Sequence, residues 1–449
     1  MADGIHYPLD YSIQDLNLIT GNGQKTNFKR LMINISYYED LFNFVTSGSL
    51  SVIDAQGFIE KMQLTGNEFI EIQIGKVKDA PDNITEIFRV YKIEKRKPSG
   101  NQNSEAYDLL FCSEELFLSE QTKVSKSYPG KLISDIIADI LEKYLQVPSN
   151  KMGKIETTNG VYDFVVPNMK PFEAISWIST YSRPQNYPGS DMIFYQTKEG
   201  FNFRSLQSIY ADDIFGTYNY SAKNVDYKEQ QNESKETSVQ KYEFFKTYDS
   251  LHEVNVGTFA NRLISIDPLI RSYYVTDFDY TKYQNQATSL NKNPPSNFFK
   301  NRLGAAQNES YEGVLKLAYS NNNEKKALYI SDDATKAAAV AHDIFIETYV
   351  PLRTAQISLA NYTKMKLTIP GDPALTVGKT IQFNMNSLDP TKDNKETDAY
   401  YSGKYIVTAL RHIFTSEQFQ TVVEIAKDSV PNKFQSISET SDWTEVIKS

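Results

Sequence analysis

Hydrophobic and polar residues alternate along short stretches near the C-terminus of the chain. Residues 365–369 read Met-Lys-Leu-Thr-Ile, which is the pattern of a half-buried β-strand. A Pro-Gly-Asp-Pro turn at 370–373 ends this strand, and a second strand begins at residues 381–383. The polar run at 389–398 predicts a long loop, and residues 405–426 predict a hairpin. Together these elements indicate a small antiparallel β-barrel.

The N-terminal part of the chain shows the same alternation in a series of short stretches separated by turns. Gly21-Asn22-Gly23 fits a hairpin turn, since it lacks the strand and helix that flank a phosphate-binding loop. Residues 37–44 predict a short helical or irregular link, and residues 58–62 predict a short helix within an insertion at 57–65. We therefore expect a first β-barrel here.

The period changes from two to about 3.6 residues after residue 121. Residues 132–145 carry an apolar stripe at helical spacing, and a second helix is predicted at 171–181. Trp177 is expected in the core beneath this second helix, where its truncation to alanine would cost about 3–5 kcal/mol. A strand pair at 191–204 follows, so this region reads as an α+β domain.

Strands return after residue 213, at 217–220, 239–248 and 273–277, and a helix is predicted at 332–348. The predicted fold class is α+β, mainly β, with two antiparallel β-barrels, an intervening α+β domain and an insertion in the second barrel. The predicted boundaries are 1–120 for the first barrel, 121–212 for the α+β domain, 213–284 and 346–430 for the second barrel, 285–345 for the insertion and 431–449 for a polar C-terminal tail.

Two groups of motifs resemble a known family. The first is KLTIPGDPALTVG at 366–378, followed by GKYIV at 403–407, His412 and FQTVVEIAK at 419–427. The second is VYDFVVPNMKPFEAISWISTYSRP at 161–184, which precedes the predicted strand pair. In this order they resemble the baseplate or tail hub proteins of contractile-tailed bacteriophages, which are related to the hub part of type VI secretion spike proteins. The resemblance implies that both barrels copy the tail-tube fold.

The same resemblance implies a structural protein of the virion, located in the tail baseplate and not an enzyme. Three chains would form a ring, which adapts the trimeric central spike to the sixfold tail tube and lines the DNA channel. The implied partners are two further copies of the chain, the spike protein, the tail tube or a distal tube-adaptor protein, the baseplate wedge proteins and the C-terminus of the tape-measure protein. DNA would pass through without specific binding.

Composition and charge argue against several classes of protein. The net charge of −9, from 47 basic and 56 acidic residues, argues against a protein that holds nucleic acid by phosphate neutralisation. The mean hydropathy is −0.48, and no apolar run approaches the roughly 20 residues of a membrane-spanning helix. The N-terminus lacks the pattern of a signal peptide. The single cysteine, Cys112, excludes an internal disulfide, so we expect synthesis in the host cytoplasm.

Candidate chemical sites are few. His6, His252, His342 and His412 are far apart, and none has metal-ligand spacing, so no catalytic, cofactor-binding or metal-binding residue is predicted and no cofactor is expected. His412 is expected to pack or to form a local hydrogen bond on a strand. The basic cluster at 92–97 is either a solvated strand end or a contact with an acidic neighbour.

Two structural expectations and two alternative functions remain. Gly371 and Gly378 are expected in turns, where a positive φ would make them irreplaceable by β-branched residues. A carbohydrate-binding tail adhesin is the first alternative, because Tyr-rich and Asn-rich surfaces can stack on sugars, but the chain lacks a fibrous repeat. A tail-associated cell-wall hydrolase is the second, and it would need a catalytic domain for which no stretch of sequence remains.

Overall fold

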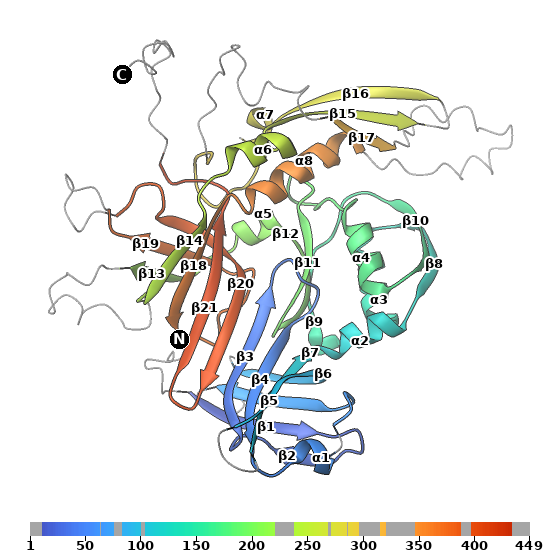
Figure 1. Cartoon of the computed structure of the whole chain (residues 1–449). Helices are drawn as coiled ribbons and strands as arrows, with labels where there is room; N and C mark the ends of the chain where they lie inside the picture. The colour runs from blue at the N-terminus through green and yellow to red at the C-terminus, as the bar shows by residue number, and fades with distance from the viewer. Residues whose placement is uncertain are drawn as a thin grey trace.

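In the computed structural model, the described residues are 11–62, 64–75, 83–99, 104–220, 238–267, 271–284, 286–295, 315–319, 346–387 and 397–432. Sheets dominate the molecule, and most helices lie in the middle of the chain (Figure 1). The α+β, mainly β fold class is therefore confirmed. Within these ranges, no helix has both the length and the apolar character needed to span a membrane.

The N-terminal strands form one half of a 13-stranded sheet. These strands are β1 (Ser12–Ile19), β2 (Lys25–Asn27), β3 (Met32–Asp40), β4 (Ser47–Asp54), β5 (Phe69–Gly75), β6 (Ile84–Pro98) and β7 (Glu105–Cys112). Alternate residues of each strand point into one core, as Ile70, Ile72 and Ile74 do in β5. The predicted helix at 58–62 is confirmed as α1 (Phe58–Met62). The predicted link at 37–44 is wrong for 37–40, because β3 continues as a paired strand to Asp40, and confirmed as irregular for 41–44.

The middle of the chain packs helices against small sheets. Its elements are α2 (Glu114–Gln121), β8 (Val124–Lys131), α3 (Ile133–Lys143), the 3-10 helix η1 (Ser149–Lys151), β9 (Met152–Ile155), β10 (Tyr162–Met169), α4 (Pro171–Ser179), β11 (Met192–Thr197), β12 (Gly200–Ser205) and α5 (Leu206–Tyr210). The two predicted helices and the strand pair are confirmed. Trp177 was predicted wrongly as core: it is only half-buried and packs edge-on against Phe164 at the rim of this core.

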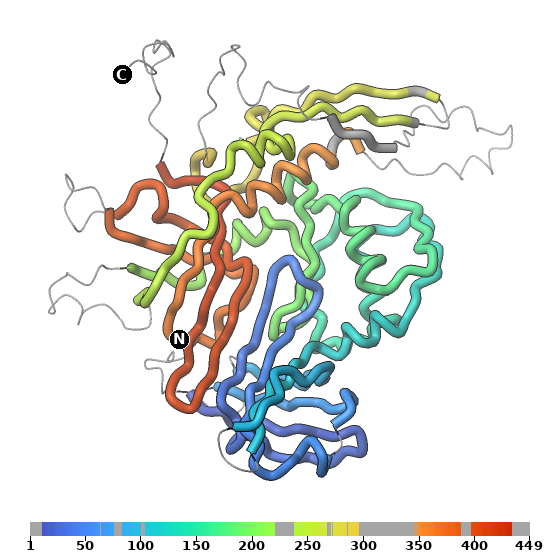
Figure 2. The backbone as a smooth tube through the Cα atoms, viewed as in Figure 1, coloured from blue at the N-terminus to red at the C-terminus, as the bar shows by residue number. Residues whose placement is uncertain are grey.

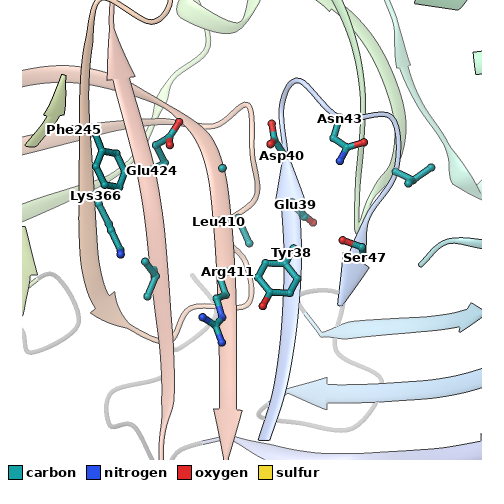
Figure 3. Close-up of a pocket in the computed structure, with 13 residues that line it drawn as sticks. Tyr38, Glu39, Asp40, Asn43, Ser47, Phe245, Lys366, Leu410, Arg411 and Glu424 are labelled. Atoms are coloured by element: carbon teal, nitrogen blue, oxygen red, sulfur yellow. The ribbon is translucent and has the colours of Figure 1, made fainter. Parts of the chain in front are cut away.

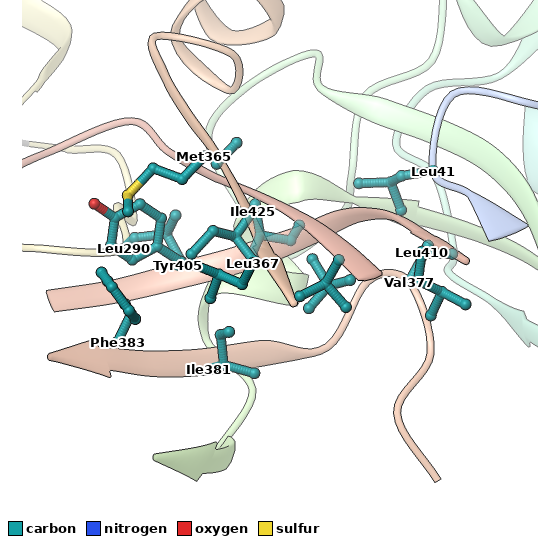
Figure 4. Packing of buried hydrophobic residues seen from close by; sticks show 14 of the residues in the cluster. Leu41, Leu290, Met365, Leu367, Val377, Ile381, Phe383, Tyr405, Leu410 and Ile425 are labelled. Carbon is teal, nitrogen blue, oxygen red and sulfur yellow. The ribbon is translucent and has the colours of Figure 1, made fainter. Parts of the chain in front are cut away.

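The C-terminal strands form the other half of the 13-stranded sheet. They are β13 (Ile214–Tyr220), β14 (Lys241–Lys246), β18 (Thr363–Pro370), β19 (Thr380–Met385), β20 (Gly403–Thr415) and β21 (Phe419–Lys427). Met365 and Leu367 of β18 meet Phe383 of β19 and Tyr405 of β20 in a second core (Figure 4). The predicted hairpin at 405–426 is confirmed as β20 and β21. The loop predicted at 389–398 lies mostly outside the described residues.

The two halves of the large sheet repeat one strand order. The first half runs β3-β4-β7-β6-β5, the second runs β14-β18-β21-β20-β19, and every neighbouring pair in both is antiparallel. β1 then adds to β5 in antiparallel and β13 to β19 in parallel orientation. The halves join through β3 and β20, which places the blue and red parts of the chain side by side (Figure 2). Among the described residues, strand pairing does not close either half into a barrel.

A second sheet lies between β14 and β18 in the chain. The elements of this stretch are α6 (Ser250–Val256), β15 (Ala260–Asp267), β16 (Ser272–Asp279), α7 (Tyr280–Gln284), β17 (Leu315–Tyr319) and α8 (Ile346–Leu359). The strand predicted at 273–277 exists as β16, but it pairs with β15 outside the large sheet. The reason is its own small core, where Leu263 of β15 packs with Ile346 and Tyr349 of α8. The helix predicted at 332–348 lies largely outside the described residues, as does most of the tail.

Candidate functional site

The seam between β3 and β20 is the feature that unites the large sheet. Residues 34–40 pair with residues 409–415 in an unbroken antiparallel register. Phe414 of β20 and Phe419 of β21 stack with their ring centroids 4.2 Å apart, and both are fully buried in the core of the first half. The tip of the second half's hairpin therefore completes the first half's core, which makes the seam a packed joint and not a surface contact.

Glu39, at the seam, connects three parts of the chain. Its carboxylate accepts hydrogen bonds from the Tyr37 hydroxyl (2.9 Å), from the backbone N–H of Lys198 between β11 and β12 (2.8 Å) and from the backbone N–H of Val377 before β19 (3.1 Å). Burial raises the pKa of Glu39 to about 7, although these three donors oppose the rise. Glu39 was not predicted from the sequence; its position two residues beyond Tyr37 on the buried face of β3 was the only available signal.

A second buried polar contact lies nearby. The Gln196 side-chain oxygen of β11 accepts hydrogen bonds from the backbone N–H of Thr46 (3.0 Å) and from the Ser113 hydroxyl (2.7 Å). Thr46 precedes β4 and Ser113 follows β7, so one amide fixes the middle region against the first half of the sheet. Buried polar contacts of this kind favour one relative placement, because any shift would leave desolvated groups without partners.

His412 lies on β20 within the seam. Its ring is 1% exposed, stacks on Tyr37 and lies 2.8 Å through Nδ1 from the Thr421 hydroxyl. The predicted local packing and hydrogen bond are confirmed. Burial lowers the pKa of His412 to about 3, and the nearby Lys198 charge acts in the same direction. The enclosed imidazole therefore contributes packing and a local hydrogen bond to the seam.

The seam has a shallow hollow of about 300 Å³ on the sheet face that points away from both cores (Figure 3). Arg411 donates to the Ser36 hydroxyl over 2.9 Å and lies over the Tyr38 ring. On the neighbouring strands, Lys364 of β18 forms an ion pair with Glu424 of β21 at 2.7 Å. Positive and negative side chains thus alternate on this face, so it has no strong charge of either sign.

The remaining candidates from the sequence are not brought together. His252 lies on α6, whereas His6 and His342 lie outside the described residues. No group of three or more His, Cys, Asp or Glu side chains suited to a metal ion occurs in the described part of the chain. Cys112 is buried, and its burial raises the pKa of the thiol to about 11, so the thiol stays protonated at neutral pH.

The basic cluster at 92–97 has acidic neighbours within the chain. Lys95 pairs with Asp108 at 2.7 Å, and Arg96 pairs with Glu105 at 2.7 Å. The cluster occupies the C-terminal part of β6, and its pairs join β6 to β7. The cluster is therefore a solvated strand end with ion pairs inside the chain, and its contact with an acidic neighbouring protein stays a prediction.

Gly371 and Gly378 differ in the way they are constrained. Gly378 has a φ of +79°, as expected for a turn that favours glycine. Gly371 is not among the positive-φ residues; instead, a Cβ placed there would lie 2.1 Å from the Phe419 ring. The expected conformational constraint is therefore confirmed for Gly378 and replaced at Gly371 by close packing under an aromatic ring.

Comparisons with known proteins agree with this architecture. No family model matches the chain. A probable baseplate hub protein of Vibrio phage KVP40 is 23% identical over 403 residues, which cover 89% of this chain and 90% of that protein. Two solved structures share the fold at 10% identity. The tail protein from Neisseria meningitidis MC58 has a TM-score of 0.51 and matches 93% of this chain and 97% of its own length. The 43 kDa tail protein of prophage MuSo2 from Shewanella oneidensis has a TM-score of 0.50 and matches 93% and 99%.

The similarity to a probable phage baseplate hub protein extends over nearly the whole chain, and the fold is shared with two tail proteins of known structure. The described residues add a packed seam and buried polar contacts to this agreement. The predicted resemblance to phage baseplate hub proteins is therefore confirmed, and the chain is similar over most of its length to a probable protein of that kind.

Proposed function

We propose that this chain is the structural hub of a phage contractile-tail baseplate. Three copies form a ring that adapts the trimeric central spike to the sixfold tail tube and lines the channel through which DNA leaves. Its location is the virion tail baseplate. The partners are the spike, the tube or its distal adaptor, the wedge proteins and the C-terminus of the tape-measure protein. We also propose that the chain comprises two tube-like units around an α+β domain, with residues 247–362 as an insertion in the second unit.

The repeated strand order of the two sheet halves is the observation that carries this proposal. Each chain supplies two units of the same antiparallel order, β3-β4-β7-β6-β5 and β14-β18-β21-β20-β19. Three chains would supply six such units. A ring of three chains then has threefold symmetry for the spike and near-sixfold symmetry for the tube. A tail adhesin or a hydrolase would have no need for this repetition.

The seam supports the role of a rigid adaptor. The two units share a core through Phe414 and Phe419, and Glu39 joins both of them to the middle region. Packed interiors of this kind resist continuous deformation, so the two units keep a fixed relative orientation. A fixed orientation is what a ring needs if each chain is to occupy one third of the circumference.

The charge pattern supports a channel wall that does not hold DNA. The face at the seam carries paired charges such as Lys364 with Glu424, and the whole chain has a net charge of −9. Phosphate binding needs a surplus of positive side chains that release counterions. We expect weak binding to duplex DNA at physiological salt, and tight, salt-sensitive binding of DNA by the purified protein would contradict a passive channel wall.

The size of the purified protein in solution tests the ring directly. Light scattering should give a mass about three times the 51.2 kDa of one chain, alone or after addition of the spike protein. A monomer under both conditions would count against the proposed ring. Release of cell-wall fragments by the purified protein would instead favour the hydrolase alternative.

A further inference from the structure

β14 and the end of β6 are among the strands of the large sheet that have an unpaired edge within the described part of the chain. β14 pairs with β18 on one side only, so its other edge ends the sheet. β6 pairs with β5 only as far as Arg89, so residues 92–98 have β7 on one side and no strand on the other. Unpaired strand edges present free N–H and C=O groups that another strand can bind.

The internal repeat relates these two edges to the seam. β6 occupies the place in the first half that β20 occupies in the second, and β3 occupies the place of β14. In its first part, β6 pairs with β5, and β20 pairs with β19 in the same way. On the other side, β6 shifts its register against β7 between Val90 and Lys92. Likewise, β20 shifts its register against β21 between Val407 and Ala409. Beyond its shift, β20 pairs with β3. Beyond its own shift, β6 pairs only with β7.

We propose that β14 of one copy pairs in antiparallel orientation with residues 92–98 of β6 in the next copy, and so repeats the β3–β20 seam between chains. This inference rests on the proposed ring, and it names the two surfaces that join its subunits. The contact is heterologous, since different surfaces of each chain meet, and three identical contacts with a threefold rotation complete the ring.

The register follows from the seam. Counting from the register shifts places Glu94 where Arg411 lies. Phe244 pairs with β18 at the place where Tyr37 pairs with β4. Phe245 follows Phe244 along the free edge as Tyr38 follows Tyr37, at the point where the register of β14 against β18 shifts. Because Arg411 is paired with Tyr38 in the seam, Glu94 should lie opposite Phe245 between copies.

The side chains at both edges suit this pairing. Phe245 on β14 is 53% exposed and Tyr91 on β6 is 47% exposed, so each edge has an aromatic side chain that is incompletely covered. Glu243 on β14 is exposed and forms no ion pair in the described part of the chain. In the antiparallel register, Glu243 faces the basic end of β6, which includes Arg96. Opposite charges on facing strands favour the correct partner and register.

Paired cysteines test the contact in the full-length protein. Directly opposed residues of antiparallel strands have Cα atoms about 4.5–5.5 Å apart, within the range of a disulfide. The double variant Phe245→Cys with Glu94→Cys should form disulfide-linked dimers and trimers under mild oxidation, whereas neither single variant should. A matched control combines Glu94→Cys with Tyr273→Cys, which is 69% exposed but lies on β16 outside the large sheet, and it should stay unlinked. The native Cys112 is buried and should not interfere.

Light scattering on the same samples separates this inference from the ring itself. A trimer without the Phe245–Glu94 link, or with equal linking of the control pair, would overturn the proposed contact and leave the ring intact. A monomer without any link would overturn both. Phe245→Glu supplies a second measurement that needs no oxidation: it should weaken self-association at least about tenfold, while Tyr273→Glu leaves it unchanged. Equal association of the two variants would overturn the contact.

Discussion

The two halves of the 13-stranded sheet repeat one strand order, yet they use very different lengths of chain between the same two strands. In the first half, residues 41–46 join β3 to β4. In the second half, residues 247–362 separate β14 from β18 and carry a second sheet and α8. The strand pairing is the same in both. A hairpin turn can therefore accept a large insertion, because the two ends of the insertion stay side by side. The entropic cost of closing a loop increases only slowly with its length.

The halves also differ in how complete they are. The second half has its own core, formed by residues such as Met365 and Phe383. The core of the first half includes Phe414 and Phe419 from the second half's hairpin. The first half therefore depends on the second more than the second depends on the first, although both repeat the same pattern.

The largest effect is expected from Phe414→Ala. This side chain belongs to the second half but is fully buried in the core of the first half. Its truncation removes buried apolar surface and leaves a cavity, which should lower the free energy of unfolding by about 3–5 kcal/mol. Urea unfolding should show that the first half is destabilised by a change in the second. Tyr273→Ala, at an aromatic side chain that is 69% exposed on β16 outside the large sheet, is the control and should change stability by at most about 0.5 kcal/mol. A loss confined to the second half would show that the halves are independent.

The next effect is a pH dependence at the seam. Burial raises the pKa of Glu39 from 4.5 to about 7, so the folded protein keeps a proton that the unfolded chain has lost between these values. Stability from this group is therefore greatest below pH 4.5 and falls as the pH rises to 7, by up to roughly 3 kcal/mol. Glu39→Gln should remove this slope in unfolding measurements across pH 4.5–7. Glu142→Gln, on the exposed face of α3, should keep it.

His412 should give the opposite slope. Burial lowers its pKa from 6.5 to about 3, so the unfolded chain binds a proton over this range that the folded protein excludes. Stability is fully present above pH 6.5 and is lost as the pH falls towards 3. The His412→Gln variant should therefore lose less of its pH 7 stability on acidification than the unchanged protein does. If both proteins lose the same free energy of unfolding between pH 6.5 and pH 3, the imidazole of His412 is protonated in the folded state.

A smaller effect concerns one glycine in each half that lies under a phenylalanine of the neighbouring strand. A Cβ at Gly48 would lie 2.4 Å from Phe111, and a Cβ at Gly371 would lie 2.1 Å from Phe419. Neither glycine has a positive φ, so the constraint is steric. Gly48→Ala and Gly371→Ala should each cost about 1–3 kcal/mol in thermal unfolding. A variant that loses no stability would show that its phenylalanine can move to make room for the added methyl group.

The smallest effects concern the ion pairs on the outward face. Lys364 is 24% exposed beside Glu424, so Lys364→Met should cost about 0.2–1 kcal/mol. Lys95 is 74% exposed beside Asp108, so Lys95→Met should give no measurable change in stability. Chemical unfolding at low and high salt provides the comparison. A larger loss for Lys95→Met would show that its charge acts over a longer range than the pair alone.

The sequence determined many of the elements and the resemblance to phage hub proteins. Alternation at 365–369 and 405–426 identified β18 and the β20–β21 hairpin, and helical spacing at 132–145 and 171–181 identified α3 and α4. These predictions succeeded because side-chain period follows from local backbone geometry. The hub motifs carry the resemblance to phage hub proteins, and the similarity to a probable phage hub protein agrees with them.

Only the tertiary structure decided which strands became neighbours. The period of β3 shows that one face is buried, but it does not show that residues 34–40 pair with 409–415 from the far end of the chain. For the same reason the sequence missed Glu39, whose partners come from three distant segments, and assigned β16 to the wrong sheet. Trp177 illustrates the limit within one helix: its spacing allows burial, and the surrounding elements cover only half of it. Partner choice depends on packing between distant segments, which no local pattern records.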